Sequence, residues 1–181
     1  TALVYLIGPV LRVSAVATKA YEQRVATCQE RLGEILPVEV NTHVSGILEF
    51  HSGAVMTAVF SFDVHAGDHS PIELYGTGGS IKVPDPNTFG GPVERILAGE
   101  KKQGWQAIEL TRPYSENSRG IGVADLAQAI IDSRPHRACG SLASHVLEVM
   151  HAFEESSKSG HSIRIESKPE RPAYGVSDRL T

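Results

Sequence analysis

The sequence is poor in the residues that mark several large classes of protein. It has only two cysteines, Cys28 and Cys139, so it lacks a disulfide framework and we expect a reducing compartment, the cytoplasm. Seventeen lysines and arginines against 21 aspartates and glutamates give a formal net charge of −4, which leaves no basic excess for a nucleic-acid backbone. No apolar run approaches the roughly 18 residues of a membrane span. We therefore expect neither nucleic acid nor a membrane as partner.

The residues that are present suffice for one hydrophobic core. The chain has 181 residues, of which 41% are hydrophobic and 6% aromatic, and a chain of this length buries roughly 70% of its unfolded surface. We expect residues 1–181 to form a single domain with a polar tail at 173–181. The chain does not open on methionine, and an apolar stretch leads straight into Gly8-Pro9. This pattern predicts that residues 1–8 are the end of a helix that belongs to a longer protein.

Strand patterns come first along the chain and helical patterns come later. Apolar residues alternate over 10–18, and two β-rich runs, 38–50 and 54–64, flank a short glycine-containing connection. Helical spacing begins after Gly120 and indicates one helix before Pro135 and a second one from Ser141 to about Gly160. This order predicts an α+β fold, in which a large, mostly antiparallel or mixed sheet carries helices on one face.

The other face of that sheet is expected to be too apolar to remain exposed to solvent. We assign Val44, Ile47, Ala54 and Val59 to it. Exposed apolar sheet faces are normally buried by association of subunits. The pattern therefore predicts a homodimer or tetramer formed through the open face.

The glycine-rich segment does not have the context of a nucleotide site. Gly76-Thr77-Gly78-Gly79 is followed by another strand pattern, whereas a phosphate cradle needs a helix N-terminus at that point. We interpret the segment as a hairpin turn. No cofactor-binding residue is assigned to this chain.

His65 and His69 are the strongest candidates for metal ligands, with Asp63 and Asp68 beside them. A pair of histidines four residues apart binds a metal when both rings project from one helix face, but this segment follows a strand and is expected to be a loop. We therefore expect no metal. His65 and His69 belong either to a solvated loop or to the rim of a substrate cleft, and we keep both as cleft candidates. The alternative is a metal-assisted hydrolase or isomerase that uses His65, Asp68 and His69.

Residues 114–122 form the most suggestive polar loop, because they join the end of a strand to the start of a helix. Loops at such junctions often line clefts, and Tyr114, Asn117 and Arg119 are suited to binding hydroxyl and carboxylate groups. For Asp125, in the following helix, a favourable interaction with the helix dipole is a sufficient explanation. We expect Cys139 to be a small buried residue and not a nucleophile.

Several strings occur in the order found in one family. They are VSGILEF at 44–50, IELYGTGGSI at 72–81, RGIGVADL at 119–126, RPHRA at 134–138 and ASHVLEVM at 143–150. With them, the chain resembles the C-terminal domain of the Gfo/Idh/MocA oxidoreductases, the family of glucose-fructose oxidoreductase and inositol dehydrogenase. The resemblance extends from residue 1 to about residue 172.

The resemblance implies a substrate-binding and oligomerisation domain of an NAD- or NADP-dependent dehydrogenase that acts on a sugar, polyol or related hydroxyl compound. In full-length members a Rossmann domain precedes this domain, binds the dinucleotide and carries the catalytic motifs. None of those motifs occurs in these 181 residues, so no catalytic residue is carried over and the chain alone is expected to be inactive. The resemblance marks 65–69 and 114–119 as cleft-facing segments. A stand-alone binding or dimerisation module without redox activity is the other alternative.

Overall fold

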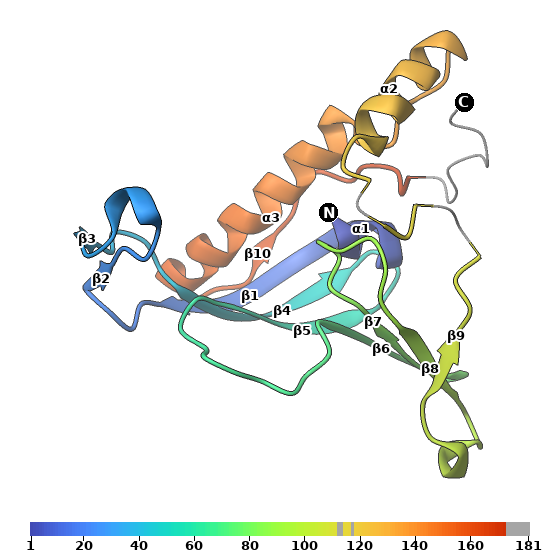
Figure 1. Ribbon diagram of the computed structural model, residues 1–181, viewed down its shortest axis with the longest axis horizontal. Coiled ribbons are helices and arrows are strands. Elements are labelled where there is room, and N and C mark those ends of the chain that lie inside the picture. The colour runs from blue at the N-terminus through green and yellow to red at the C-terminus, as the bar shows by residue number, and fades with distance from the viewer. Residues whose placement is uncertain (112–113, 117, 173–181) are drawn as a thin grey trace. The chain divides into compact units, whose positions relative to one another are not determined.

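The computed structural model describes residues 1–111, 114–116 and 118–172. The sequence predicts a single domain, and the contacts divide the described chain into two compact units, one of residues 1–66 with 139–172 and one of residues 67–138. Both units contain antiparallel sheet together with helix (Figure 1). The predicted α+β class is therefore confirmed.

The first unit is built on a four-stranded sheet with the order β10-β1-β4-β5. Its strands are β1 (Val10–Thr18), β4 (His43–Phe50), β5 (Val55–Ser61) and β10 (Ile163–Arg164), and each pairing is antiparallel. The long helix α3 (Gly140–Ser159) lies across one face of this sheet (Figure 1). Glycine allows the tight turn between β4 and β5, because Gly53 has a φ of 86°.

The core of this unit lies between the sheet and α3. Val13, Leu48 and Ala58 face the helix from three adjacent strands and are buried. Phe153 of α3 packs edge to face on Phe60, with 5.8 Å between ring centroids. The helix approaches so closely that a Cβ on Gly46 would lie 2.9 Å from the Phe153 ring and 2.7 Å from the Ser14 carbonyl oxygen.

The opposite face of the sheet is exposed and partly apolar. Ile47 and Val59 lie there as predicted, with 48% and 57% of their surface exposed, and Val16 and Val55 join them at 64% and 70%. The assignment of Val44 and Ala54 to this face is wrong, since both pack against the core. Strand alternation explains Val44, which shares the face of Leu48 and Phe50.

Two smaller elements complete the first unit. The short helix α1 (Ala2–Ile7) ends at Gly8, whose N–H donates to the Val4 carbonyl. The strands β2 (Gln23–Val25) and β3 (Ile35–Pro37) form a two-stranded antiparallel ribbon around a 3₁₀ turn at Gln29–Arg31. This ribbon is fixed to the end of β5 by an ion pair between Arg24 and Asp63.

The second unit has a four-stranded antiparallel sheet and one helix. The sheet consists of β6 (Ile72–Gly76), β7 (Gly79–Val83), β8 (Val93–Leu97) and β9 (Gln106–Ile108), in that order. A 3₁₀ turn at Lys101–Gln103 precedes β9, and α2 spans Ile121–Ile131. The predicted hairpin at 76–79 is confirmed, and only glycine fits at Gly79, where a Cβ would lie 2.2 Å from the Ile96 carbonyl oxygen.

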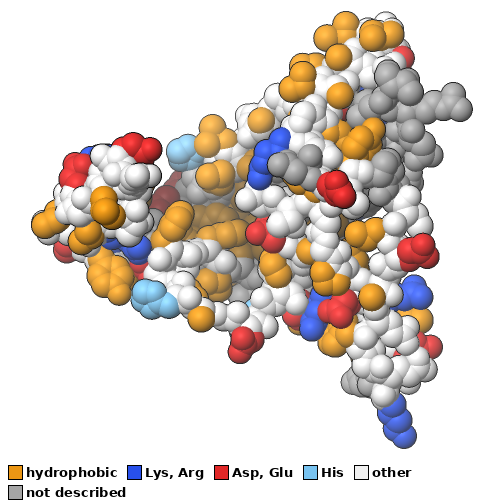
Figure 2. All heavy atoms as spheres, viewed as in Figure 1, with side chains coloured by type: hydrophobic (Ala, Val, Ile, Leu, Met, Phe, Trp, Pro, Cys, Tyr) orange, Lys and Arg blue, Asp and Glu red, His pale blue; other side chains and the backbone are white. Residues whose placement is uncertain are grey.

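Helix α2 carries its apolar residues on the outside. Val123, Leu126 and Ile130 are exposed, whereas Asp125 and Ala129 are buried, and apolar side chains gather visibly over this helix (Figure 2). Within the described residues, no helix is both long enough and apolar enough to cross a membrane.

Candidate functional site

A shallow cavity of about 270 Å³ opens between two loops of the second unit. One loop, residues 84–92, connects β7 to β8, and the other, residues 114–119, leads into α2. The lining residues are Asn87, Thr88, Phe89, Ser115, Glu116 and Arg119. The cavity therefore includes the loop that the sequence singles out as cleft-lining.

Local hydrogen bonds shape the first loop. The Asp85 carboxylate accepts from the Asn87 N–H at 2.8 Å, and the Asp85 carbonyl accepts from the Thr88 N–H at 2.9 Å and from the Thr88 hydroxyl at 2.7 Å. This is the turn that aspartate favours, because its short side chain reaches the backbone two residues further on. The turn presents Asn87 and Thr88 to the cavity.

Glycine lets the two loops approach each other closely. A Cβ on Gly90 would lie 2.7 Å from the carbonyl oxygen of Ser115, which is closer than real Cβ contacts. Gly91 has a φ of 121°, a conformation that other residues rarely adopt. The residue pair Gly90-Gly91 thus permits the walls of the cavity to meet.

Arg119 is held across the cavity by the first loop. Its Nη2 donates to the Asn87 side-chain oxygen at 3.0 Å and to the Asn87 carbonyl at 3.4 Å. The guanidinium carbon lies 5.9 Å from the centre of the Phe89 ring, within range of a cation–π interaction. Its Nε and Nη1 have no hydrogen-bond partner among the described residues, so these donors remain for a ligand.

The cavity therefore combines complementary polar groups with one apolar surface. Arg119 supplies donors, Glu116 supplies a carboxylate acceptor, and Thr88 and Ser115 supply hydroxyls. The Phe89 ring offers a flat surface for C–H groups. Sites for small polar molecules combine a few placed polar groups with apolar contact in this way.

Of the predicted cleft residues, the structure places one in this cavity. Arg119 lines it. Tyr114 precedes the lining residue Ser115, is half-buried and has a φ of 71°, which is uncommon outside glycine. Asn117 lies outside the described residues.

His65 and His69 are not brought into this cavity. Both are exposed, and they fall in different units. Asp63, next to them in sequence, is already engaged, since it accepts from the Thr42 hydroxyl at 2.6 Å and pairs with Arg24. The Thr42 hydrogen bond, with further help from Arg24, lowers the pKa of Asp63.

The part of the chain that the structure describes contains no group of three histidine, cysteine or carboxylate residues that could hold a metal ion. The alternative of a metal-assisted hydrolase built on His65, Asp68 and His69 therefore gains no support from the geometry.

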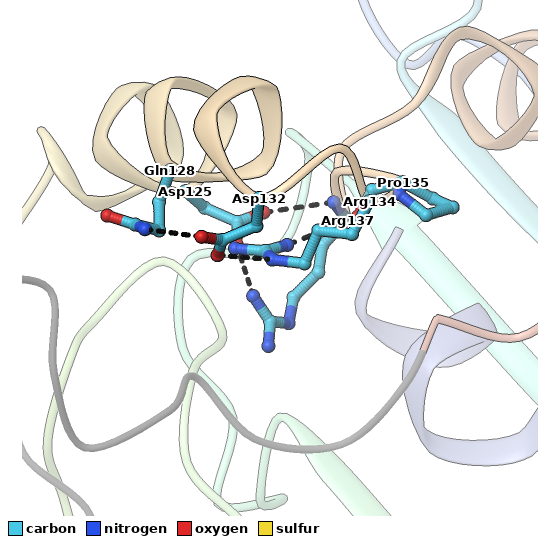
Figure 3. Close-up of polar contacts among 6 residues, drawn as sticks. All are labelled: Asp125, Gln128, Asp132, Arg134, Pro135 and Arg137. Atoms are coloured by element: carbon cyan, nitrogen blue, oxygen red, sulfur yellow. Dashed lines mark hydrogen bonds and ion pairs between the residues drawn. The ribbon is translucent and has the colours of Figure 1, made fainter.

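Asp125 has a role that the sequence interpretation missed. It is only 5% exposed, and its carboxylate accepts from Arg134 Nη2 at 2.9 Å, from the Arg137 N–H at 3.0 Å and from Arg137 Nη1 (Figure 3). Burial raises the pKa of Asp125, but hydrogen bonds and charges from the two arginines outweigh it and lower the pKa below 3.8. The helix-dipole explanation is therefore insufficient. The sequence signal for these ion pairs was the presence of two arginines, Arg134 and Arg137, nine and twelve residues after Asp125.

Cys139 differs in a smaller way from its prediction. It is half-buried and not fully buried, and its sulfur lies 3.1 Å from the Ser141 hydroxyl at the start of α3. Hydrogen bonds from Ser141 and from the Leu142 N–H lower the pKa of the Cys139 thiol.

Comparison with known proteins identifies what this fold resembles. Residues 1–82 match the family model described as GFO/IDH/MocA C-terminal domain, and the resemblance stated from the sequence motifs is confirmed. No curated protein matches the chain significantly in sequence.

Solved structures share the fold over nearly all of the chain. Levoglucosan dehydrogenase in its apo form is 19% identical with a TM-score of 0.74, and the alignment covers 92% of this chain and 49% of that one. Its complex with NADH and L-sorbose is 20% identical with a TM-score of 0.71, and the alignment covers 91% of this chain and 47% of that one. Aldose-aldose oxidoreductase from Caulobacter crescentus, complexed with glycerol, is 21% identical with a TM-score of 0.65, and the alignment covers 90% of this chain and 44% of that one. The chain thus spans about half the length of the solved structures it matches.

Proposed function

We propose that this chain, whose first 82 residues match the C-terminal domain of the Gfo/Idh/MocA oxidoreductases, is the substrate-binding and oligomerisation part of an NAD- or NADP-dependent dehydrogenase. Its substrate is a sugar, a polyol or a related hydroxyl compound. The two units act together as one domain in this proposal. The free thiols of Cys28 and Cys139 suit a cytoplasmic protein, and the net charge of −4 does not favour nucleic acid.

The observation that carries the proposal is the chemistry of the cavity beside Arg119. A hydroxyl group both donates and accepts, so a ligand with neighbouring hydroxyls can accept from Arg119 and donate to Glu116. Its C–H faces can rest on Phe89. In two of the compared structures the bound compounds are L-sorbose and glycerol, which are molecules of this chemistry.

The glycine-rich turn does not have the form of a dinucleotide site. The turn at 76–79 joins β6 to β7 and leads into no helix, so it offers no row of free N–H groups to a pyrophosphate. We therefore assign this chain the binding and orientation of the substrate, and we assign dinucleotide binding and hydride transfer to other parts of a longer protein. The coding sequence upstream of Thr1 tests this division: a glycine-rich βαβ unit supports it, and a start codon there favours the stand-alone module.

The oligomerisation role is proposed for the exposed face of the first unit's sheet. Val16, Ile47, Val55 and Val59 form an apolar surface on adjacent strands β1, β4 and β5. The polar residues His43 and Ser61 continue the same face and bond to each other at 2.9 Å. An apolar centre with a polar margin is typical of subunit interfaces.

Titration of the isotope-labelled chain with levoglucosan and L-sorbose, followed by NMR, tests the substrate site. The amide signals of Asn87, Phe89 and Arg119 should shift in a saturable way. The shifts should vanish in Arg119→Ala, which removes the Nε and Nη1 donors. They should persist in Arg31→Ala, because the Arg31 guanidinium bonds to Glu34 and belongs to the first unit. Saturable shifts elsewhere, or unchanged binding in Arg119→Ala, would refute the assignment.

A further inference from the structure

The C-terminal end of the described chain is tied to the first unit by side chains of α3. We call residues 165–171 the strap. The Ile165 N–H donates to the Leu11 carbonyl at 2.9 Å, and Ile165 is buried. The Glu166 and Ser167 N–H groups donate to the two oxygens of Glu148 at 2.6 and 3.1 Å. The strap thus lies against β1 on one side and α3 on the other.

The strap also closes the end of α1. Arg171 donates from Nε to the Tyr5 carbonyl at 2.7 Å and from Nη2 to the Leu6 carbonyl at 2.5 Å. The last carbonyls of a helix have no partner within the helix, and a cation at that end is favourable. Arg171 is therefore a C-terminal cap for α1.

His145 joins these elements from the inside. It is 0% exposed, its Nε2 lies 3.0 Å from the Val10 N–H at the start of β1, and its Nδ1 lies 2.7 Å from the Ser167 hydroxyl in the strap. A backbone N–H can only donate, so Nε2 accepts and carries no proton. The neutral ring then has its proton on Nδ1, which donates to Ser167.

A proton on Nε2 is incompatible with this arrangement. It would place two N–H groups against each other at 3.0 Å and would leave a charged ring without contact with water. The Nδ1–H bond to Ser167 is compatible with either charge state, so the strain falls on the buried, charged ring itself, which only contact with water relieves. We propose that His145 is a pH-sensitive latch: opening of the strap gives the protonated ring that water, so protonation releases the strap, and with it the cap on α1, while the sheet and α3 stay folded. This proposal does not depend on the function proposed above.

The charged groups around His145 set the range in which the latch works. Glu148 faces it from α3, His51 from the turn between β4 and β5, and the α-amino group of Thr1 from α1, while Glu166 and Lys168 flank Ser167 in the strap. Burial lowers the pKa of His145 below 6.5, and the Ser167 bond and Glu148 offset this only in part. The pKa of Glu148 is also lowered, because its hydrogen bonds outweigh its burial, so the ionised form of Glu148 is favoured.

The direction of the pH effect follows from these protonation states. The closed strap binds the proton less tightly than the open strap, in which His145 has an ordinary histidine pKa near 6.5. The closed state is therefore fully favoured above pH 6.5 and loses stability as the pH falls below that value. Between pH 7.5 and 5.5 the open population should rise, by at most about tenfold, which is the limit for a closed ring that takes up no proton.

Amide hydrogen exchange of the 181-residue chain, expressed as protection factors at both pH values, tests the latch. Protection at Glu166 and Ser167 should fall, by at most about tenfold, while protection at Leu48 in the core stays constant. His145→Gln keeps one acceptor and one donor but does not titrate, so its strap should show no pH response. The control His151→Gln makes the same substitution at an exposed position of α3 and should respond as the wild type does.

Three outcomes would overturn the latch. They are a wild-type strap whose protection is the same at both pH values, an equal response in His145→Gln, and a loss confined to the Val10 amide. If His145→Gln does not fold, the tautomer of the His145 ring in the wild-type protein, measured by NMR at pH 7.5, tests the proposal instead. The proposal requires the proton on Nδ1, and a proton on Nε2 refutes it.

Discussion

Single buried or half-buried polar side chains connect segments of this chain that lie apart in the sequence. His145 connects β1, α3 and the strap, Asp63 connects the β2–β3 ribbon to the end of β5, and Asp125 connects α2 to the segment after it. Each of these groups replaces the hydrogen bonds it would make to water with bonds inside the protein. Removing one of them should therefore cost more than removing an exposed ion pair.

Asp125→Asn removes the charge that two arginines share. We expect a loss of about 2 kcal/mol in the free energy of unfolding, below the range for a fully buried pair because both arginines are partly exposed. Asp132→Asn, at the more exposed neighbouring carboxylate, should cost less than about 1 kcal/mol. Urea denaturation of the two variants measures both values, and equal losses would contradict the role assigned to Asp125.

The same carboxylate predicts a response to acid. Its folded pKa lies below 3.8, so the stability it contributes is present above pH 3.8 and is lost as the pH falls towards the folded pKa. The difference in unfolding free energy between wild type and Asp125→Asn should therefore shrink below pH 3.8. A difference that stays constant down to pH 2.5 would show that the charge of Asp125 is not what matters.

At the scale of elements, close packing distinguishes glycines that look alike in the sequence. Gly46→Ala places a methyl group against the Ser14 carbonyl and the Phe153 ring and should destabilise the protein by about 1–3 kcal/mol. Gly122→Ala, in α2 with nothing within 4 Å of its Cβ, should stabilise it by about 0.5–1 kcal/mol. Thermal unfolding compares the two variants with the wild type, and changes in melting temperature of the same sign would contradict this account of the packing.

Local patterns were sufficient to predict most elements. Alternating apolar residues predicted β1, β4 and β5, and the glycine turn predicted the β6–β7 hairpin. The face of an individual residue such as Val44 depended on strand register, which a one-residue error inverts. The exposed apolar side of α2 could not be predicted either, because helical spacing shows that a stripe exists and not what covers it.

The candidate site could be predicted in part. Arg119 was predicted as a cleft residue because its loop joins a strand to a helix, and the structure places it in the lining of the cavity. Asn87, Phe89 and Glu116 were missed, since the first two lie in a proline-rich loop far away in sequence and Glu116 has no distinguishing neighbours. Only the approach of the loops at Gly90 brings them together.

At the scale of the whole molecule, the exposed sheet face predicts association. The purified chain should sediment as a dimer or a larger oligomer at micromolar concentration. Ile47→Glu should convert it to monomers, because the substitution places a charge at the centre of the apolar face. Val40→Glu, at a residue that is also exposed but lies outside that sheet, should leave the oligomer unchanged. A monomeric wild type, or dissociation in both variants, would argue against this face.

The central claim is that this chain holds a substrate site and no dinucleotide site. Equilibrium binding of NADH to the purified 181-residue chain tests it most directly, in parallel with levoglucosan. We predict that the sugar binds and that NADH binding is absent or too weak to saturate in the millimolar range. Strong, stoichiometric NADH binding by these 181 residues would contradict the claim.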